Sequence, residues 1–148
     1  MLSRRAMILM TLSSVAACGR RPSEPDLYPG ETAHMRTLIN YWADEYEVPR
    51  SLFHRVIQRE SDYRAFARNG PYYGLMQILP ETARTMGHRG PADELLDPNV
   101  NLQYAGKYLR GAWLVSRGNQ DKAVMWYARG YYYEAKRLGL LYETGLRT

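Results

Sequence analysis

The sequence predicts a single all-α domain, and three observations support this. The chain has 148 residues, which is enough for one hydrophobic core but not for two. Several segments repeat apolar residues at positions i, i+3, i+4 and i+7, the spacing of one helix face. No segment alternates apolar and polar residues as a half-buried strand does. The net charge of +5 is spread along the chain, so it does not choose among nucleic acid, anionic lipid and anionic polymer as partners.

The N-terminus, residues 1–17, reads as an export signal rather than as part of the fold. Arg4 and Arg5 precede an apolar run over residues 6–17 that is too short to span a bilayer. The run ends in small residues directly before Cys18, the only cysteine. This arrangement resembles the lipobox of bacterial lipoproteins, and the resemblance implies that Cys18 carries a lipid. The alternative is an ordinary secretory signal with an incidental cysteine.

The next segment, residues 18–32, is expected to be the lipidated cysteine followed by a flexible tether. It contains three prolines and Gly30 without any apolar periodicity. The folded domain is then expected over residues 33–148. Gly19, rather than an aspartate, follows the cysteine, and this sorting pattern favours the outer membrane. The predicted location is therefore the periplasm, with a lipid anchor in the outer membrane.

Two helices are expected to open the domain. The first covers about residues 31–46, with apolar positions at Met35, Leu38, Ile39 and Trp42. The second follows Pro49 and places Phe53, Val56, Ile57 and Glu60 on one face. Burial and the negative end of the helix dipole both favour a protonated Glu60, the form that a general acid needs. The alternative is a Glu60 that faces solvent or pairs with an arginine. This alternative is favoured as long as only the helix pattern, without the residues that follow, is considered.

The later helices follow from capping residues and breakers. A short helix is expected over residues 82–86, stopped by Gly87, and residues 88–96 are rich in turns. Asp97 and Pro98 form an N-cap and first helical residue for a long helix to about residue 117. Asn119 is placed to cap a helix over residues 120–127, and a last helix is expected over residues 131–138.

Several chemistries are not supported by the sequence. The three histidines are scattered and no cysteine remains to join them, so neither a metal site nor a cofactor is expected. No glycine-rich phosphate loop follows a strand. Glu60 and Asp62 are two positions apart and would diverge on a helix, so Asp62 is not a second catalytic carboxylate.

Five motifs occur in an order that resembles the SLT domain of lytic transglycosylases. They are Glu60-Ser61, the segment GLMQILPETA over residues 74–83, DPNVN over residues 97–101, Tyr108-Leu109 and YARG over residues 127–130. The resemblance covers about residues 33–140. It implies a lysozyme-like fold, related to goose-type lysozyme, with a substrate cleft. Each motif alone is a weak signal, but their order and spacing together are specific.

The resemblance also implies an activity. The family cleaves the β-1,4 bond between N-acetylmuramic acid (MurNAc) and N-acetylglucosamine (GlcNAc) in peptidoglycan, and it leaves 1,6-anhydro-MurNAc ends. Its single catalytic glutamate matches Glu60, as general acid and then general base. The expected partners are peptidoglycan glycan strands, the membrane through the anchor, and a cell-envelope machine such as a flagellum or secretion system. We expect a monomer that does not bind nucleic acid.

The same resemblance suggests substrate contacts. Gln77 is expected to reach a sugar amide or hydroxyl, and Met76 to supply an apolar floor. Tyr127 is expected to place its hydroxyl near Glu60, although a core role is equally compatible with its position. Asn101 is interpreted as a structural hydrogen-bonding residue.

Two segments depart from the family pattern. The loop before the GLMQ motif lacks the usual serine, and Asn69 and Tyr73 of this loop are the candidate substrate contacts. In the late motif Ala128 and Arg129 replace Asn and Ala, so an expected polar contact is absent. The following run of tyrosines over residues 131–133 is a candidate to form this side of the substrate cleft with aromatic rings instead. Two other functions stay open: a goose-type-like muramidase that uses water, and a non-catalytic wall-binding or secretion-assembly lipoprotein.

Overall fold

A computed structural model describes residues 24–147, and it confirms the all-α, lysozyme-like fold. The predictions for the export signal and for Cys18 lie outside the described residues. Within the described range, the helices are α1 (Ala33–Glu45), α2 (Arg50–Glu60), α3 (Pro80–Thr85), the 3-10 helix η1 (Ala92–Leu96), α4 (Pro98–Val115), α5 (Gln120–Arg129) and α6 (Tyr132–Leu138). None of these helices is long and apolar enough to cross a membrane.

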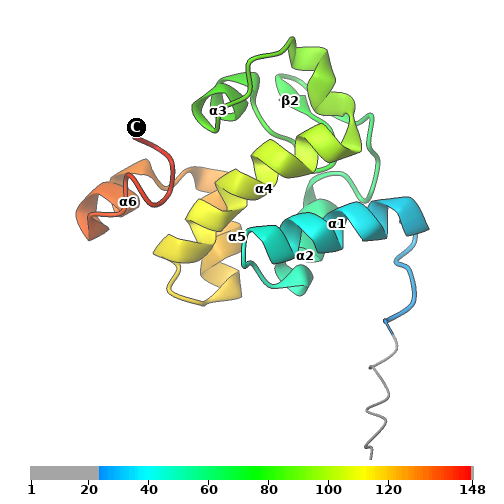
Figure 1. Cartoon of the computed structure of the whole chain (residues 1–148), viewed down its shortest axis with the longest axis horizontal. Coiled ribbons are helices and arrows are strands. Elements are labelled where there is room, and N and C mark those ends of the chain that lie inside the picture. The colour runs from blue at the N-terminus through cyan, green and yellow to red at the C-terminus, as the bar shows by residue number, and fades with distance from the viewer. Residues whose placement is uncertain (1–23, 148) are drawn as a thin grey trace, which may run out of the picture.

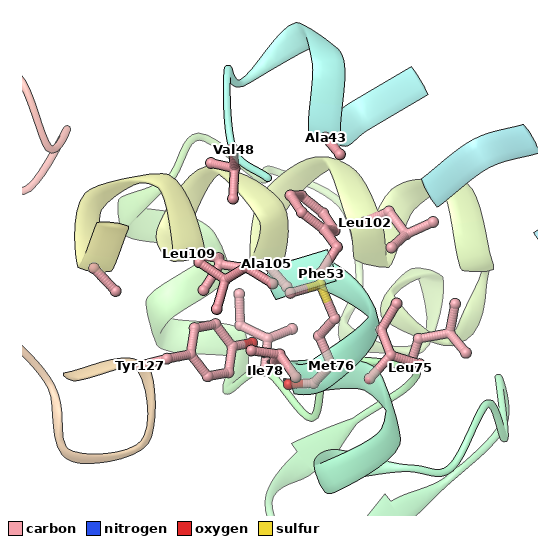
Figure 2. Close-up of a cluster of buried hydrophobic side chains, with 14 of the residues drawn as sticks. Ala43, Val48, Phe53, Leu75, Met76, Ile78, Leu102, Ala105, Leu109 and Tyr127 are labelled. Atoms are coloured by element: carbon pink, nitrogen blue, oxygen red, sulfur yellow. Dashed lines mark hydrogen bonds between the residues drawn. The ribbon is translucent and has the colours of Figure 1, made fainter. Parts of the chain in front are cut away.

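The long helix α4 is the centre of the domain. It packs against α1, α3, α5 and α6, while α2 packs against α1 and α5 (Figure 1). Figure 2 shows the core between these helices, with Phe53, Leu102 and Leu109 all fully buried. Gly106 allows Phe53 to approach α4, because a Cβ at this position would lie 2.8 Å from Phe53 Cζ. The small residue at position 106 thus allows α2 and α4 to lie close together.

The predicted capping residues are confirmed where α4 and α5 begin. Asp97 Oδ1 accepts a 3.0 Å hydrogen bond from the Val100 N–H, and Asn119 Oδ1 accepts one of 2.9 Å from the Lys122 N–H. Thr32 does the same for α1, which therefore begins two residues later than predicted. The predicted helix boundaries agree with the structure within a few residues, and α5 continues to Arg129.

The last part of the predicted tether is packed on the domain. Glu31 and Arg36 are almost completely buried, and the Arg36 guanidinium donates to both Glu31 carboxylate oxygens and to the backbone carbonyls of Pro25 and Asp26. Tyr28 stacks on Tyr63 with ring centroids 5.9 Å apart. Part of the segment expected to be a tether is thus hydrogen-bonded to α1 through Arg36, at Pro25, Asp26 and Glu31. Proline content alone could not show that a buried arginine supplies partners for this backbone.

A small hairpin interrupts the helices after α2, and the prediction of no strands is wrong here. Strand β1 (Arg68–Asn69) pairs antiparallel with β2 (Tyr72–Tyr73) across Gly70 and Pro71. Tyr73 also bridges to Ile78 through backbone hydrogen bonds of 3.1 Å in both directions. Strands of two residues are too short to show a period-2 pattern in the sequence.

Candidate active site

Glu60 is the last residue of α2 and, as predicted, continues the apolar stripe of that helix. Val56 and Ile57 on this stripe are buried, and the Glu60 side chain retains only 23 % of its exposure. Ser61 follows as the helix cap and is itself buried. Its hydroxyl donates a 2.7 Å hydrogen bond to the Leu75 carbonyl, which fixes the end of α2 to the GLMQ turn.

Two adjoining hollows lie in front of these residues. The Glu60 hollow, of ≈ 250 Å³, is lined by Arg59, Glu60, Asn69, Tyr72, Gln77, Tyr127 and Ala128. The Arg129 hollow, of ≈ 230 Å³, is lined by Tyr72, Gln77, Ile78, Leu79, Thr82, Tyr108, Tyr127, Ala128, Arg129 and Gly130. They share four residues, so they are neighbouring parts of one groove. Glu60 is the only carboxylate among the described residues that line either hollow.

The environment of Glu60 favours its neutral form. Burial raises the pKa of this carboxyl above its ordinary value of 4.5, and the Arg59 guanidinium opposes the shift only partly. Arg59 is half-exposed and its Nε lies 3.8 Å from Glu60 Oε1, beyond hydrogen-bond distance. The shift moves this carboxyl, which faces an open hollow, toward the protonation state that a general acid requires.

Gln77 faces both hollows from the GLMQ turn. Its backbone is in the left-handed region with φ +48°, and its side chain is 6 % exposed. The amide nitrogen donates to the carbonyls of Ala67 (3.0 Å) and Gly74 (2.8 Å). The amide oxygen is the one buried side-chain polar atom, among the described residues, without a hydrogen-bond partner. A buried acceptor without a partner is unusual in a folded protein, and this one belongs to a residue that lines both hollows.

Asn101 holds this turn in place, as the sequence predicted for a structural residue. Its Oδ1 accepts from the Met76 N–H at 2.9 Å, and its Nδ2 donates to the carbonyls of Tyr73 and Leu95, each at 2.8 Å. Gly74 has φ +76°, and a Cβ there would collide with the Asn101 amide and the Leu95 carbonyl. A glycine is therefore required where α4, η1 and the turn meet.

Tyr127 lines the same hollow as Glu60, and its hydroxyl is hydrogen-bonded to the backbone. Its hydroxyl donates to the Met76 carbonyl at 2.7 Å, and no hydrogen bond to Glu60 occurs among the described residues. Burial raises the Tyr127 pKa well above its ordinary value, and the nearby Glu60 charge raises it further. Because the Tyr127 hydroxyl donates to a backbone carbonyl, its oxygen keeps acceptor capacity.

Two predicted substrate contacts do not line the groove. Met76 is fully buried within the core cluster of Figure 2, so its side chain supports the turn from behind rather than forming a floor for a ligand. Tyr73 receives the Arg68 guanidinium on its ring and hydroxyl. Its neighbour Tyr72 lines both hollows instead, because successive residues of a strand point to opposite faces. Asn69 does line the Glu60 hollow, as expected.

With the geometry established, comparison with known families identifies the domain. The family model described as the Transglycosylase SLT domain matches residues 37–142. The chain belongs to the SLT transglycosylase family. No solved structure gives a significant match. The matched range contains every residue of the two hollows.

The SLT groove also contains residues that the sequence reasoning missed. Arg59, Tyr72, Tyr108 and Arg129 all line it. Tyr108 is part of the Tyr-Leu motif, which was the available signal for its position. Tyr131 does not rebuild the wall as suggested: it is buried, and its hydroxyl donates to the Tyr108 carbonyl at 2.8 Å.

The described part of this SLT domain contains no cluster of three or more histidine, cysteine or acidic side chains placed to hold a metal ion. The buried histidines have other partners. His54 Nδ1 shares a hydrogen bond of 2.7 Å with the Tyr63 hydroxyl, and His88 Nε2 lies 3.1 Å from Glu94. Glu60 is the only carboxylate, and no histidine occurs, among the described residues that line the groove.

Proposed function

We propose that this SLT domain is a peptidoglycan lytic transglycosylase in which Glu60 is the single general acid and base. The observation that supports this most directly is a half-buried carboxyl with a raised pKa in a groove that has no second carboxylate among its described lining residues. The substrate is a glycan strand of alternating GlcNAc and MurNAc. It is cleaved at the MurNAc-β-1,4-GlcNAc bond.

Glu60 transfers two protons in turn, one as an acid and one as a base. Neutral Glu60 donates its proton to the glycosidic oxygen as the bond from MurNAc C1 to that oxygen breaks, and the GlcNAc leaves with a new hydroxyl. The resulting Glu60 carboxylate takes the proton of the C6 hydroxyl of the same MurNAc. The C6 oxygen then bonds to C1, which gives the 1,6-anhydro ring. Glu60 ends protonated and no water is consumed.

The lack of a second carboxylate favours this route over hydrolysis. Glycosidases that hydrolyse usually place two carboxyl groups about 5–9.5 Å apart, one to act on water or on C1. The groove offers only Glu60 among its described lining residues. A C6 hydroxyl of the substrate replaces activated water, and its attachment to the same sugar supplies the high effective concentration of an intramolecular nucleophile.

The neighbouring polar groups are assigned to substrate binding. The Gln77 amide oxygen, which has no partner within the described residues, accepts from a sugar N–H or hydroxyl. Asn69 and Tyr72 line the same hollow from the hairpin and give it one polar and one aromatic side. Aromatic rings of this kind suit the apolar faces of sugars.

The domain is further proposed to act in the periplasm from a lipid anchor on Cys18 in the outer membrane. The support is the apolar run that ends in small residues directly before the only cysteine, with Gly19 after it. A location at the cell wall would bring the groove to its polymeric substrate. Service to a flagellum or secretion system fits such a location.

The deciding experiment is a digest of purified sacculi with the wild-type protein and with Glu60→Gln. We expect 1,6-anhydro-muropeptides from the wild type, and a rate about 10²- to 10⁴-fold lower for the variant, the range of general acid–base catalysis. Glu60→Gln is expected to retain binding to sacculi. Arg55→Ala, which breaks an exposed ion pair with Asp121, is the control and should remain active.

Each rival function has its own result. Products with free reducing MurNAc ends and no anhydro ends would establish a goose-type-like muramidase. Sacculi that bind the wild-type protein but are never cleaved, with or without envelope partners, would establish a non-catalytic wall-binding lipoprotein.

A further inference from the structure

Arg129 is the cationic side chain of the Arg129 hollow. It is the last residue of α5, it is exposed, and it lines this hollow together with Gln77 and Tyr127. It stands at the end of the groove that Glu60 does not line.

The guanidinium has no acidic partner within residues 24–147. Other arginines of the domain do have such partners: Arg36 pairs with Glu31, Arg50 with Asp44, Arg55 with Asp121 and Arg137 with Glu134. The residues that line the Arg129 hollow include no aspartate or glutamate. Arg129 therefore contributes an uncompensated positive charge to one end of the groove, whereas the charged residues at the other end are Arg59 and Glu60.

We propose that Arg129 binds a carboxylate carried by the glycan strand, and so selects which part of the strand enters the Arg129 hollow. This inference rests on the proposed function. A guanidinium presents a planar fork of donors that matches a carboxylate in a two-point contact. The sugar rings themselves are neutral. The carboxylate therefore comes from the MurNAc lactyl group, when its peptide has been removed, or from the stem peptide when it is present.

The test compares the wild type with Arg129→Ala, Arg129→Lys and Lys122→Ala. Lys122 is an exposed cation on the same helix that lines a different hollow, so Lys122→Ala removes an equal charge outside the groove. Substrates are glycan strands that carry stem peptides and strands whose peptides an amidase has removed. Each substrate is used as it is and after its carboxylates have been converted to amides.

We expect Arg129→Ala to lower kcat/KM by about three- to fivefold at low salt on the substrate that carries the recognised carboxylate, the size of a solvent-exposed ion pair. The loss should disappear at high salt and on the amidated substrate. Arg129→Lys should lose less, because it keeps the charge. Lys122→Ala should behave as wild type. The arm in which the loss appears identifies the lactyl group or the stem peptide as the source.

Three results would overturn the proposal. They are an equal loss on amidated strands, an equal loss in Lys122→Ala, and a fall in melting temperature without any change in kcat/KM, which would make Arg129 only a stabiliser of the α5 C-terminus.

Binding to the same four substrates is measured in parallel in the Glu60→Gln background. If the wild type releases no anhydro products but the Arg129 effect on binding persists, the proposed activity fails and the carboxylate site stands. If no substrate binds, the carboxylate site is refuted as well.

Discussion

Glu60 and Glu31 are two carboxylates whose pKa values are shifted in opposite directions. Both oxygens of Glu31 accept hydrogen bonds, from Arg36 Nε (2.7 Å), from Arg36 Nη2 (2.6 Å) and from the Tyr28 N–H (2.9 Å). Burial alone would raise the pKa of Glu31, but these donors outweigh it and the pKa lies below its ordinary value. Glu60 accepts no hydrogen bond among the described residues, and burial raises its pKa.

The comparison shows that burial alone does not decide whether a buried carboxyl is ionised. The number of hydrogen-bond donors around it decides in which direction its pKa is shifted. A fully satisfied Glu31 stays ionised and fixes residues 25–32 onto α1. Glu60 has no such donors, so its pKa is raised, and it faces an open groove. Glu31 therefore contributes to the architecture, whereas the raised pKa of Glu60 favours proton donation.

The largest expected loss of stability comes from removing Glu31, the carboxylate whose hydrogen bonds are satisfied. Glu31→Ala leaves the buried Arg36 charge without its carboxylate, and such a loss costs on the order of 3 kcal/mol. We expect a clear fall in the free energy of unfolding in urea, with protease cleavage within residues 25–32.

The matched control for that variant is Asp44→Ala. It removes an exposed ion pair between Asp44 near the end of α1 and Arg50 at the start of α2, whose side chains are 58 % and 47 % exposed, and it should cost less than about 1 kcal/mol. Equal losses in the two variants would show that water reaches Glu31, and the contrast with Glu60 would then fail.

A smaller effect is expected from Tyr127→Phe, which tests the role of a residue that lines the same hollow as Glu60. The variant leaves the buried Met76 carbonyl without its donor, at a cost of about 1 kcal/mol. Denaturant unfolding measures this cost, and sacculus digestion should fall less than tenfold. A loss of activity as large as that of Glu60→Gln, without loss of stability, would instead make Tyr127 a catalytic residue.

The smallest expected effect is a gain in stability from Glu60→Gln. Because the folded-state pKa of Glu60 is raised above 4.5, the ionised carboxyl costs stability at higher pH, by about 1 kcal/mol or less. The melting temperature of the variant should exceed that of wild type at pH 7, and the difference should vanish below pH 4.5, where both side chains are neutral. A variant less stable than wild type at pH 7 would mean that Glu60 has donors after all.

Much of the fold was predictable because its signals are local. The caps Asp97 and Asn119 act on N–H groups three residues away, and the stripe that contains Glu60 lies within one helix. The order of the SLT motifs placed Glu60, Gln77 and Asn69 in one groove, where the structure also finds them.

The rest depended on contacts between distant segments. The choice of Tyr72 over Tyr73 depends on a hairpin of two-residue strands, which leaves no periodic pattern. The Tyr127 hydroxyl bonds to a carbonyl 51 positions away, and nothing in the local sequence distinguishes that acceptor from Glu60.

The sequence by itself determined the helices, their caps and the carboxylate on a buried stripe, because each depends on spacings within one or two turns. Only the tertiary structure decided how many donors each carboxylate meets. Arg36 reaches Glu31, while the donors nearest Glu60 are engaged elsewhere or lie too far away. The pKa of each carboxyl depends on the donors that the fold brings close to it. The chemical difference between the two glutamates therefore appears only in the folded domain.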